Sequence, residues 1–302
     1  MHLKENVGIM RNSYSAFLAL ALLFQSPLAQ CDDTDTRLIP SLDPSTFRTS
    51  LNEIHIEHDN QSRRLLVVTP HDFEKDSIYP VLLCFHGAGG RAEGQARRWA
   101  PLTTQHNMLL VSVEAVQPLA KWNFMDGFHA VDHDDVGLVR TIVKTLISYG
   151  IADPMAIYAT GHSSGGLFCY RLAKESSLFA AICPMSCGMA KGAHDPDGAT
   201  TQTSILQVIG DRDKSFHGST TPKITMYSSD ERIDIWRTFL ACTPDPITAR
   251  YGNTMTLRTY TNKNDIAVAI CEVQGEGHIL QNALRSKADS IALTFMHNHK
   301  KQ

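Results

Sequence analysis

The chain has 302 residues, of which 43% are hydrophobic and 20% charged, and its formal net charge is −3. A chain of this length and composition can bury a large core, as one domain of about 250 residues or as two smaller ones. Because the lysines and arginines are scattered and the net charge is slightly negative, the composition argues against nucleic acid or an anionic membrane surface as a partner.

Residues 1–30 have the order of a secretory signal peptide. Lys4 and Arg11 precede an apolar run at 16–24, and residues 27–29 provide a cleavage region. The run is shorter than the roughly 20 apolar residues that a membrane span needs. We therefore expect no membrane span and a protein that is exported, to the extracellular space or the periplasm. The alternative is an N-terminal helix that is not cleaved.

The next segment, 31–50, is polar and contains Pro40 and Pro44, so we interpret it as a linker. It begins at Cys31, the position where a bacterial lipoprotein would be lipidated. Gln30 stands where such a signal needs a small residue, so we do not expect lipid anchoring at Cys31.

Residues 51–302 have the pattern of a single α/β domain. Two strand-like segments, 51–59 and 63–70, meet near Asp59-Asn60 and predict an antiparallel hairpin. Short apolar runs then alternate with helical patterns at 134–150 and 165–176. Continuous apolar strands that alternate with helices predict a mostly parallel central sheet covered by helices on both faces. The apolar runs are 79–85, 107–113, 155–161, 179–185 and 203–210.

The segment Gly161-His162-Ser163-Ser164-Gly165 has the form G-x-S-x-G between a predicted strand and a predicted helix. In this setting the glycines permit a sharp turn that exposes a nucleophilic serine at its tip. Ser163 has glycine two residues before and after it, whereas Ser164 has His162 two residues before, so Ser163 is the candidate nucleophile. The alternative is a glycine-rich phosphate-binding turn, but neither G-x-G-x-x-G nor G-x-x-x-x-G-K-[ST] is present here.

A serine nucleophile needs a histidine base and a carboxylate that orients the histidine. Asp211 and Asp213 follow the apolar run 203–210, and His278 follows the strand-like segment 267–275, in the order serine, acid, histidine. The residues alone do not choose between Asp211 and Asp213, and His278 could instead be a surface histidine.

The loop His86-Gly87-Ala88-Gly89-Gly90 follows an early strand and is rich in small residues. Such a loop can turn a backbone N–H toward a developing oxyanion, with a second N–H from the residue after the nucleophile. We assign these two donors to Ala88 and Ser164, with His86 and Gly87 as alternatives to Ala88.

Three further features complete the candidate site. The acids of Asp132-His133-Asp134-Asp135 are interpreted as the start of a helix rather than as metal ligands. Trp122 could line a substrate pocket or anchor a loop in the core.

Among the seven cysteines, Cys242 and Cys271 are candidates for a disulfide because they flank the segment before the histidine loop, and Cys84 is expected to be a buried thiol. We expect no metal and no cofactor.

With these residues in place, the chain resembles the polyhydroxybutyrate depolymerase and feruloyl or acetylxylan esterase family of the α/β-hydrolase fold. The resemblance implies an ester hydrolase with Ser163, Asp213 and His278 as its triad and a Cys242–Cys271 bridge. It implies an ester substrate, such as a plant cell-wall polysaccharide or a polyester oligomer. His162 and Ser164 depart from the family's pattern. The matching segments, between about residues 65 and 280, are YPVLLCFHGAGG, KWNF, 134–173, IGDRD, IWRTFLAC and CEVQGEGH.

Two other classes of function are compatible with these residues. A serine peptidase or an acyltransferase would use the same acyl-enzyme step on the same fold. A non-catalytic binding protein on a hydrolase scaffold is the other alternative, although such a protein need not keep all three residues of the triad.

Overall fold

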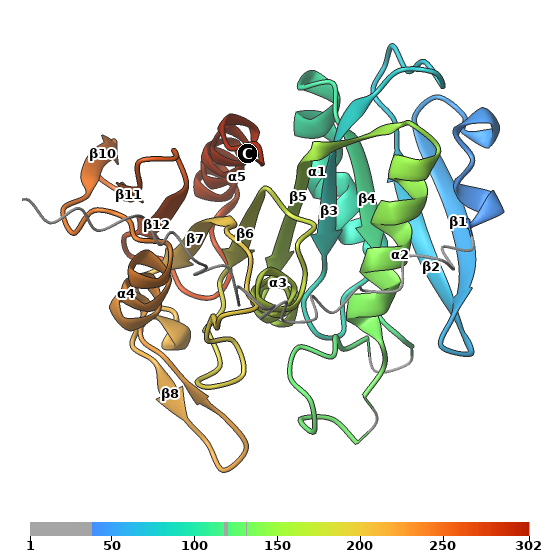
Figure 1. The fold of residues 1–302 in the computed structure, drawn as a ribbon. Helices are drawn as coiled ribbons and strands as arrows, with labels where there is room; N and C mark the ends of the chain where they lie inside the picture. Colours follow the sequence, from blue (N-terminus) through green and yellow to red (C-terminus); the bar gives the residue numbers. More distant parts are fainter. Residues whose placement is uncertain (1–37, 118–119, 131, 302) are drawn as a thin grey trace, which may run out of the picture. The chain divides into compact units, whose positions relative to one another are not determined.

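A computed structural model describes residues 38–117, 120–130 and 132–301 (Figure 1). The predicted signal peptide and Cys31 lie outside the described residues. A ten-stranded sheet has the strand order β1-β2-β4-β3-β5-β6-β7-β12-β11-β10. Its strands are β1 (Leu51–His58), β2 (Gln61–Val68), β3 (Tyr79–Phe85), β4 (Leu109–Val113), β5 (Ala152–His162), β6 (Ala181–Met185), β7 (Ser204–Gly210), β10 (Ile247–Tyr251), β11 (Met255–Thr261) and β12 (Ala267–Val273).

The middle of the sheet is parallel and its two edges are antiparallel. Neighbouring strands from β4 to β12 along the sheet pair in parallel. The predicted N-terminal hairpin is confirmed, since β1 pairs antiparallel with β2 around Asp59 and Asn60, which both have positive φ. A second hairpin of β10 and β11, which the sequence analysis did not anticipate, extends the other edge. The expected α/β architecture is therefore confirmed.

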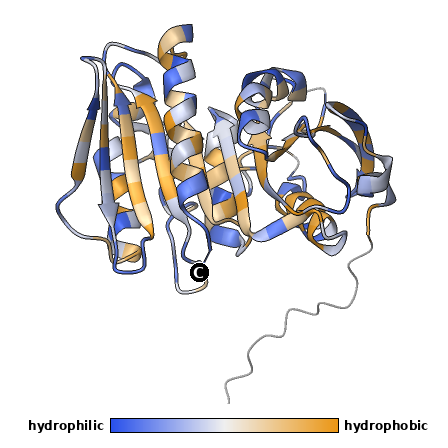
Figure 2. Cartoon of the chain, turned by 90° about the horizontal axis from the view of Figure 1, so that it is seen from above, coloured by the Kyte–Doolittle hydropathy of each residue, from blue (hydrophilic) through white to orange (hydrophobic). Residues whose placement is uncertain are grey.

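Helices cover both faces of the sheet (Figure 1). Helices α1 (Ala92–Gln105) and α5 (Asn282–Asn298) pack on one face, and α2 (Asp135–Ser148), α3 (Ser164–Glu175) and α4 (Ser229–Phe239) on the other. In β3, Leu83 and Phe85 belong to the core under α2, α3 and α4, whereas Leu82 and Cys84 belong to the other core. This alternation is the period of a strand buried on both faces. Figure 2 shows the resulting concentration of hydrophobic residues on the strands.

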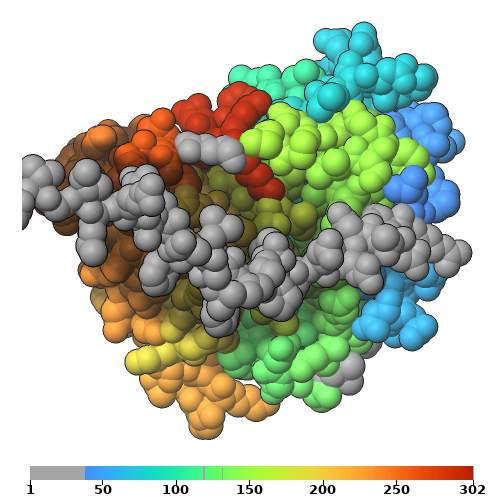
Figure 3. All heavy atoms as spheres, in the orientation of Figure 1, coloured from blue at the N-terminus to red at the C-terminus, as the bar shows by residue number. Residues whose placement is uncertain are grey.

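Helix α2 forms where the sequence predicted a helix, and its outer side is part of the surface in Figure 3. Asp134 is its N-cap, with the side chain accepting a hydrogen bond from the Gly137 N–H at 2.8 Å. Asp135 is buried and paired with Arg63 at 2.7 Å. These acids therefore begin the helix, as expected. In the described part of the chain, no group of three or more His, Cys, Asp or Glu side chains could hold a metal ion.

The folded domain begins before residue 51. Residues 38–50, expected as part of a linker, contain two 3-10 turns, Pro40–Leu42 and Pro44–Thr46. Leu42 is fully buried in the core, which fixes this segment on the domain. The linker interpretation is wrong for these residues because two prolines here lie in tight turns rather than in an extended spacer. No described helix is long and apolar enough to cross a bilayer.

Cys242 and Cys271 are free thiols, so the predicted disulfide is wrong. Cys271 points from β12 into the core beneath α1 and α5, whereas Cys242 lies in the core on the opposite face of the sheet. The Cys242 thiol is near the carbonyl oxygen of Ile266, with a sulfur-to-oxygen distance of 3.6 Å. The sheet therefore separates the two sulfur atoms. Cys84 is a buried free thiol, as expected.

Iodoacetamide should alkylate both Cys242 and Cys271 when the protein is unfolded without a reductant, because neither sulfur is bonded to another. Peptide mass mapping would detect the two modified peptides, and a reduced sample serves as the control. A peptide pair joined through Cys242 and Cys271 in the unreduced sample would contradict the placement of these two cysteines on opposite faces of the sheet.

Candidate active site

Ser163 occupies a strained turn between β5 and α3. Its backbone has φ 56° and ψ −117°, a conformation that non-glycine residues rarely adopt. A Cβ added to Gly161 would lie 2.2 Å from the Gly165 carbonyl oxygen, and a Cβ added to Gly165 would lie 2.4 Å from the Phe85 carbonyl oxygen. Neither position therefore has room for a side chain. The glycine frame exists because the backbone before and after Ser163 comes into direct contact.

The turn brings Ser163 to His278 and Asp213, which come from two loops at the same edge of the sheet. The Oγ atom of Ser163 lies 3.0 Å from Nε2 of His278. The other ring nitrogen, Nδ1, lies 2.8 Å from Oδ2 of Asp213. The neutral tautomer with its proton on Nδ1 donates to Asp213 and leaves Nε2 to accept the hydroxyl proton of Ser163. The three side chains thus form one continuous chain of hydrogen bonds.

The carboxylate and the imidazole perturb each other. The hydrogen bond to Asp213 raises the pKa of His278 above its ordinary value, and partial burial opposes the increase. Burial would raise the pKa of Asp213, but hydrogen bonds from His278 and from the Ser215 N–H outweigh it and lower that pKa. The side chain of Asp213 is 2% exposed, whereas that of His278 is 47% exposed. The acid is therefore fixed inside, and the imidazole faces the solvent and any incoming substrate.

Asp213, rather than Asp211, contacts the histidine. The Oδ1 atom of Asp211 accepts a hydrogen bond from the Gly275 N–H at 2.7 Å and so ties the two loops together. Gly210 allows this approach, since a Cβ there would lie 2.2 Å from the Glu276 carbonyl oxygen. Of the two acids that the sequence left open, Asp213 is therefore the one whose carboxylate contacts the imidazole ring.

Arg232 is a second support for the acid loop that the sequence analysis missed. It is fully buried in α4, and its guanidinium donates to the carbonyl oxygen of Ser215 at 3.0 Å and to that of Tyr227 at 3.1 Å. It also donates to the side chains of Gln207 and Ser229. These hydrogen bonds fix the turn that follows Asp213. The sequence signal was weak, because a charged residue in a helix is usually exposed.

His162 braces the histidine loop from the other side. Its Nε2 lies 3.1 Å from the carbonyl oxygen of His278, and the two rings are in an edge-to-face arrangement with centroids 5.0 Å apart. Burial lowers the pKa of His162 to about 4, so the ring is neutral near pH 7 and donates to that carbonyl. In the sequence analysis, His162 served to exclude Ser164 as the nucleophile and was otherwise noted as a departure from the family pattern. The structure gives that departure a physical role.

The two backbone N–H groups assigned to the oxyanion belong to the first residue of α3 and to the loop after β3. Ser164 is the first residue of α3, where an N–H has no partner within the helix. In the loop after β3, the N–H groups of Gly89 and Gly90 donate to the carbonyl oxygens of Ala120 and Gly87, respectively. Among the described residues, no hydrogen bond involves the N–H group of Ala88. The N–H of Gly87 is unused in the same part of the chain, and a Cβ there would lie 3.4 Å from Cβ of Ser163. Ala88 and Gly87 both remain candidates for the loop donor.

Trp122 supports this loop from beneath and does not line a pocket. It is fully buried, and its Nε1 donates to the carbonyl oxygen of His86 at 2.8 Å. Its ring stacks on Phe168 with centroids 5.1 Å apart and meets Phe85 edge-on. The pocket interpretation is wrong because the indole turns inward to satisfy a carbonyl next to the serine turn. The alternative, a core tryptophan that anchors a loop, is confirmed.

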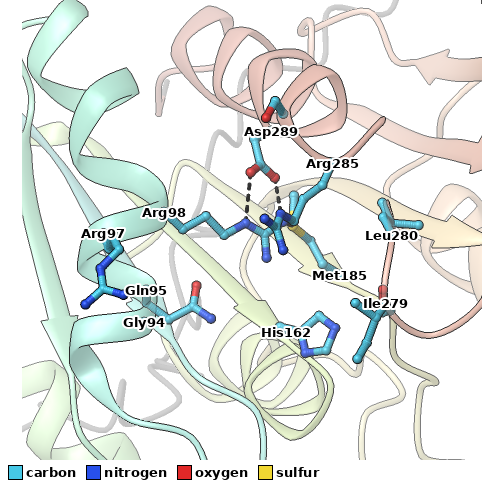
Figure 4. Close-up of a pocket in the computed structure, with 12 residues that line it drawn as sticks. Gly94, Gln95, Arg97, Arg98, His162, Met185, Ile279, Leu280, Arg285 and Asp289 are labelled. Carbon is cyan, nitrogen blue, oxygen red and sulfur yellow. Dashed lines mark hydrogen bonds and ion pairs between the residues drawn. The ribbon is translucent and has the colours of Figure 1, made fainter. Parts of the chain in front are cut away.

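A cavity of about 520 Å³ lies between α1 and α5 (Figure 4), and its lining includes residues next in sequence to Ser163 and His278. His162 and Ile279, the chain neighbours of those two residues, form part of its wall. The cavity is large enough to hold a small molecule, and its wall adjoins the serine turn in sequence.

Comparisons with known proteins agree with this fold. A curated relative from Aspergillus clavatus, named "Probable feruloyl esterase C", is 26% identical over 192 residues, which cover 61% of this chain and 64% of the relative. Acetyl xylan esterase from Aspergillus awamori has a TM-score of 0.57 at 15% identity, with 80% of this chain and all of that chain covered. The poly(3-hydroxybutyrate) depolymerase LpqC from Bordetella parapertussis has a TM-score of 0.57 at 16% identity, with 87% and 94% covered.

No family model matches the chain. The match spans less than two thirds of the length of the curated feruloyl esterase. The solved structures establish that this chain has the α/β-hydrolase fold.

Replacing Asp213 with asparagine should lower the pKa of His278, because the carboxylate that raises it is lost. NMR titration of the His278 ring nitrogens, assigned with His278→Gln, would measure the change against the wild-type protein. Asp211→Asn is the matched control, since its side chain bonds Gly275 instead. An unchanged His278 pKa in Asp213→Asn would contradict the geometry.

Proposed function

We propose that the protein is a serine ester hydrolase in which Ser163, His278 and Asp213 form a catalytic triad. The observation that carries the proposal is the unbroken hydrogen-bonded chain from Asp213 through His278 to Ser163, at 2.8 and 3.0 Å. The strained backbone at Ser163 adds support, because strain of this kind concentrates at functional sites. The esterase names of the relatives point to the same chemistry.

The first half of the reaction forms an acyl-enzyme. Oγ of Ser163 attacks the ester carbonyl carbon while Nε2 of His278 takes the hydroxyl proton. The negative charge that develops on the carbonyl oxygen is stabilised by the backbone N–H groups of Ser164 and Ala88, with Gly87 as the alternative loop donor. Asp213 stabilises the imidazolium that forms. His278 then gives its proton to the departing alcohol oxygen, and the acyl group remains on Ser163.

Water completes the cycle. His278, neutral again, takes a proton from a water molecule that attacks the acyl carbon, and Ser163 leaves with a proton returned by His278. The ring must be neutral to accept either proton. Because Asp213 raises the pKa of His278, the activity increases as the pH rises through that raised pKa.

The relatives also suggest where to look for the substrate and where the protein acts. Their names specify feruloyl esters, acetyl xylan and poly(3-hydroxybutyrate), so a panel of hydroxycinnamoyl, acetylated-sugar and hydroxybutyrate esters covers the substrate classes that we propose. The signal-peptide pattern in residues 1–30 supports export of the protein.

A fluorophosphonate probe should label Ser163, because Oγ of that residue is the activated nucleophile. Ser163→Ala should lose labelling and at least about 10⁴-fold in kcat for p-nitrophenyl acetate, the order expected when such a triad loses its nucleophile. Ser164→Ala should still be labelled, because it keeps Ser163. Peptide mapping that places the label on Ser164, or on no serine of this turn, would contradict the assignment.

Asp213→Asn should lower kcat by about 10⁴-fold, since an asparagine at this place favours the wrong histidine tautomer. Asp211→Asn removes a loop contact and keeps the orienting carboxylate, so its kcat should stay within about tenfold of wild type. Steady-state kinetics on p-nitrophenyl acetate compares the two. Equal losses in both variants would mean that the carboxylate acts only by holding the loops.

A further inference from the structure

The cavity lined by His162 and Ile279 carries an excess of positive charge. Arg97 and Arg98 contribute from α1 and Arg285 from α5, whereas Asp289 is the one acid among the described residues that line it. Figure 4 shows Arg98 and Arg285 pointing toward the cavity from opposite sides. Three guanidinium groups against one carboxylate leave the cavity positively charged.

Asp289 neutralises only one of these arginines. Its Oδ2 accepts a hydrogen bond from Nε of Arg98 at 2.9 Å, and the carboxylate is 5% exposed. Arg285 donates to the neutral side chain of Asn282 at 2.7 Å. No ion pair in the described ranges joins Arg285 or Arg97 to a carboxylate. The charge of Arg285 is therefore available to an anionic ligand.

Met185 links the charged wall to the serine turn. Nη2 of Arg98 lies 3.0 Å from Sδ of Met185, whose carbonyl oxygen accepts the N–H of Ser163 at 2.9 Å. His162 precedes Ser163 in the chain and lines the same cavity, and the charge of Arg98 helps to keep its ring neutral. Adjacent Cα atoms are about 3.8 Å apart. The wall of the cavity is therefore one residue away from Ser163 along the chain.

The cavity also has an apolar rim. Ile279 follows His278 and is 73% exposed, and Leu280 and Met185 continue the apolar surface inward. An exposed isoleucine on the wall of a cavity can contact the carbon chain of a ligand. The cavity thus combines an apolar contact at Ile279 with the guanidinium of Arg285, which has no ion-pair partner among the described residues.

We propose that this cavity selects esters that carry a carboxylate a few bonds from the ester group, with Arg285 facing the carboxylate and Ile279 contacting the chain between them. The inference rests on the proposed ester hydrolysis and adds the substrate class. The carboxylate can belong to the acid part, as in a dicarboxylic acid monoester, or to the alcohol part, as in an ester of a hydroxy acid.

Two pairs of substrates distinguish these sources. Mono-p-nitrophenyl glutarate against p-nitrophenyl pentanoate tests a carboxylate on the acid side, and 4-acetoxybenzoate against methyl 4-acetoxybenzoate tests one on the alcohol side. The quantity measured is the ratio of kcat/KM for the anionic ester over the neutral one, after subtraction of the enzyme-free rate. Comparison between protein variants cancels the intrinsic difference in reactivity within each pair.

We expect the ratio to fall about threefold in Arg285→Gln and about tenfold in Arg285→Glu in at least one pair, and to fall in the wild type as salt is added. Arg97→Gln should lower it less, because Arg97 lies at the edge of the cavity. Arg250→Gln, an exposed arginine on β10, is the matched control and should leave the ratio as in wild type.

The outcomes separate the two proposals. Hydrolysis of the neutral esters with a ratio that neither Arg285 variant changes in either pair overturns the charge selection and leaves the esterase function standing. Failure to hydrolyse any of the four esters, with no labelling of Ser163, overturns both. A change confined to one pair supports the proposal and identifies the part of the ester that carries the carboxylate.

Discussion

The site depends on one backbone contact, the approach of Gly161 and Gly165 to each other and to the end of β3. This contact holds Ser163 at positive φ, a conformation that costs roughly 1–3 kcal/mol. Hydrogen bonds offset the cost, since the Ser163 N–H donates to the carbonyl oxygen of Met185 and its own carbonyl accepts from the first turn of α3. The same contact places the glycine-rich loop after β3 beside the serine.

The strand order then brings the other two residues within reach. Strands β7 and β12 are neighbours and parallel, so the loops that follow them emerge at the same edge. Asp213 and His278 are 65 residues apart in sequence and 2.8 Å apart in space. Gly210 lets the two loops touch, and Arg232 and His162 fix them from either side. The precision of the site comes from these supports rather than from the three polar residues themselves.

The sequence predicted the parallel core and the serine turn well because both have strong local signals, apolar runs and fixed glycines. It failed where the orientation of a single side chain decides the outcome. Cys242 and Cys271 were predicted to pair, but Cys271 on β12 points to one face of the sheet, whereas Cys242, in the loop after α4, lies in the core on the other face. Trp122 turns inward for one carbonyl hydrogen bond. Such contacts join distant segments, and no local pattern of residues specifies them.

Detection of the acyl-enzyme tests the central claim most directly. The protein is mixed with excess p-nitrophenyl acetate, quenched in acid within the first turnover, and examined by intact mass and peptide mapping. The account predicts one added acetyl group, located on Ser163, that forms together with a burst of p-nitrophenol. Steady hydrolysis with no acetyl group on Ser163 at any quench time, or an acetyl group on another residue, would contradict it.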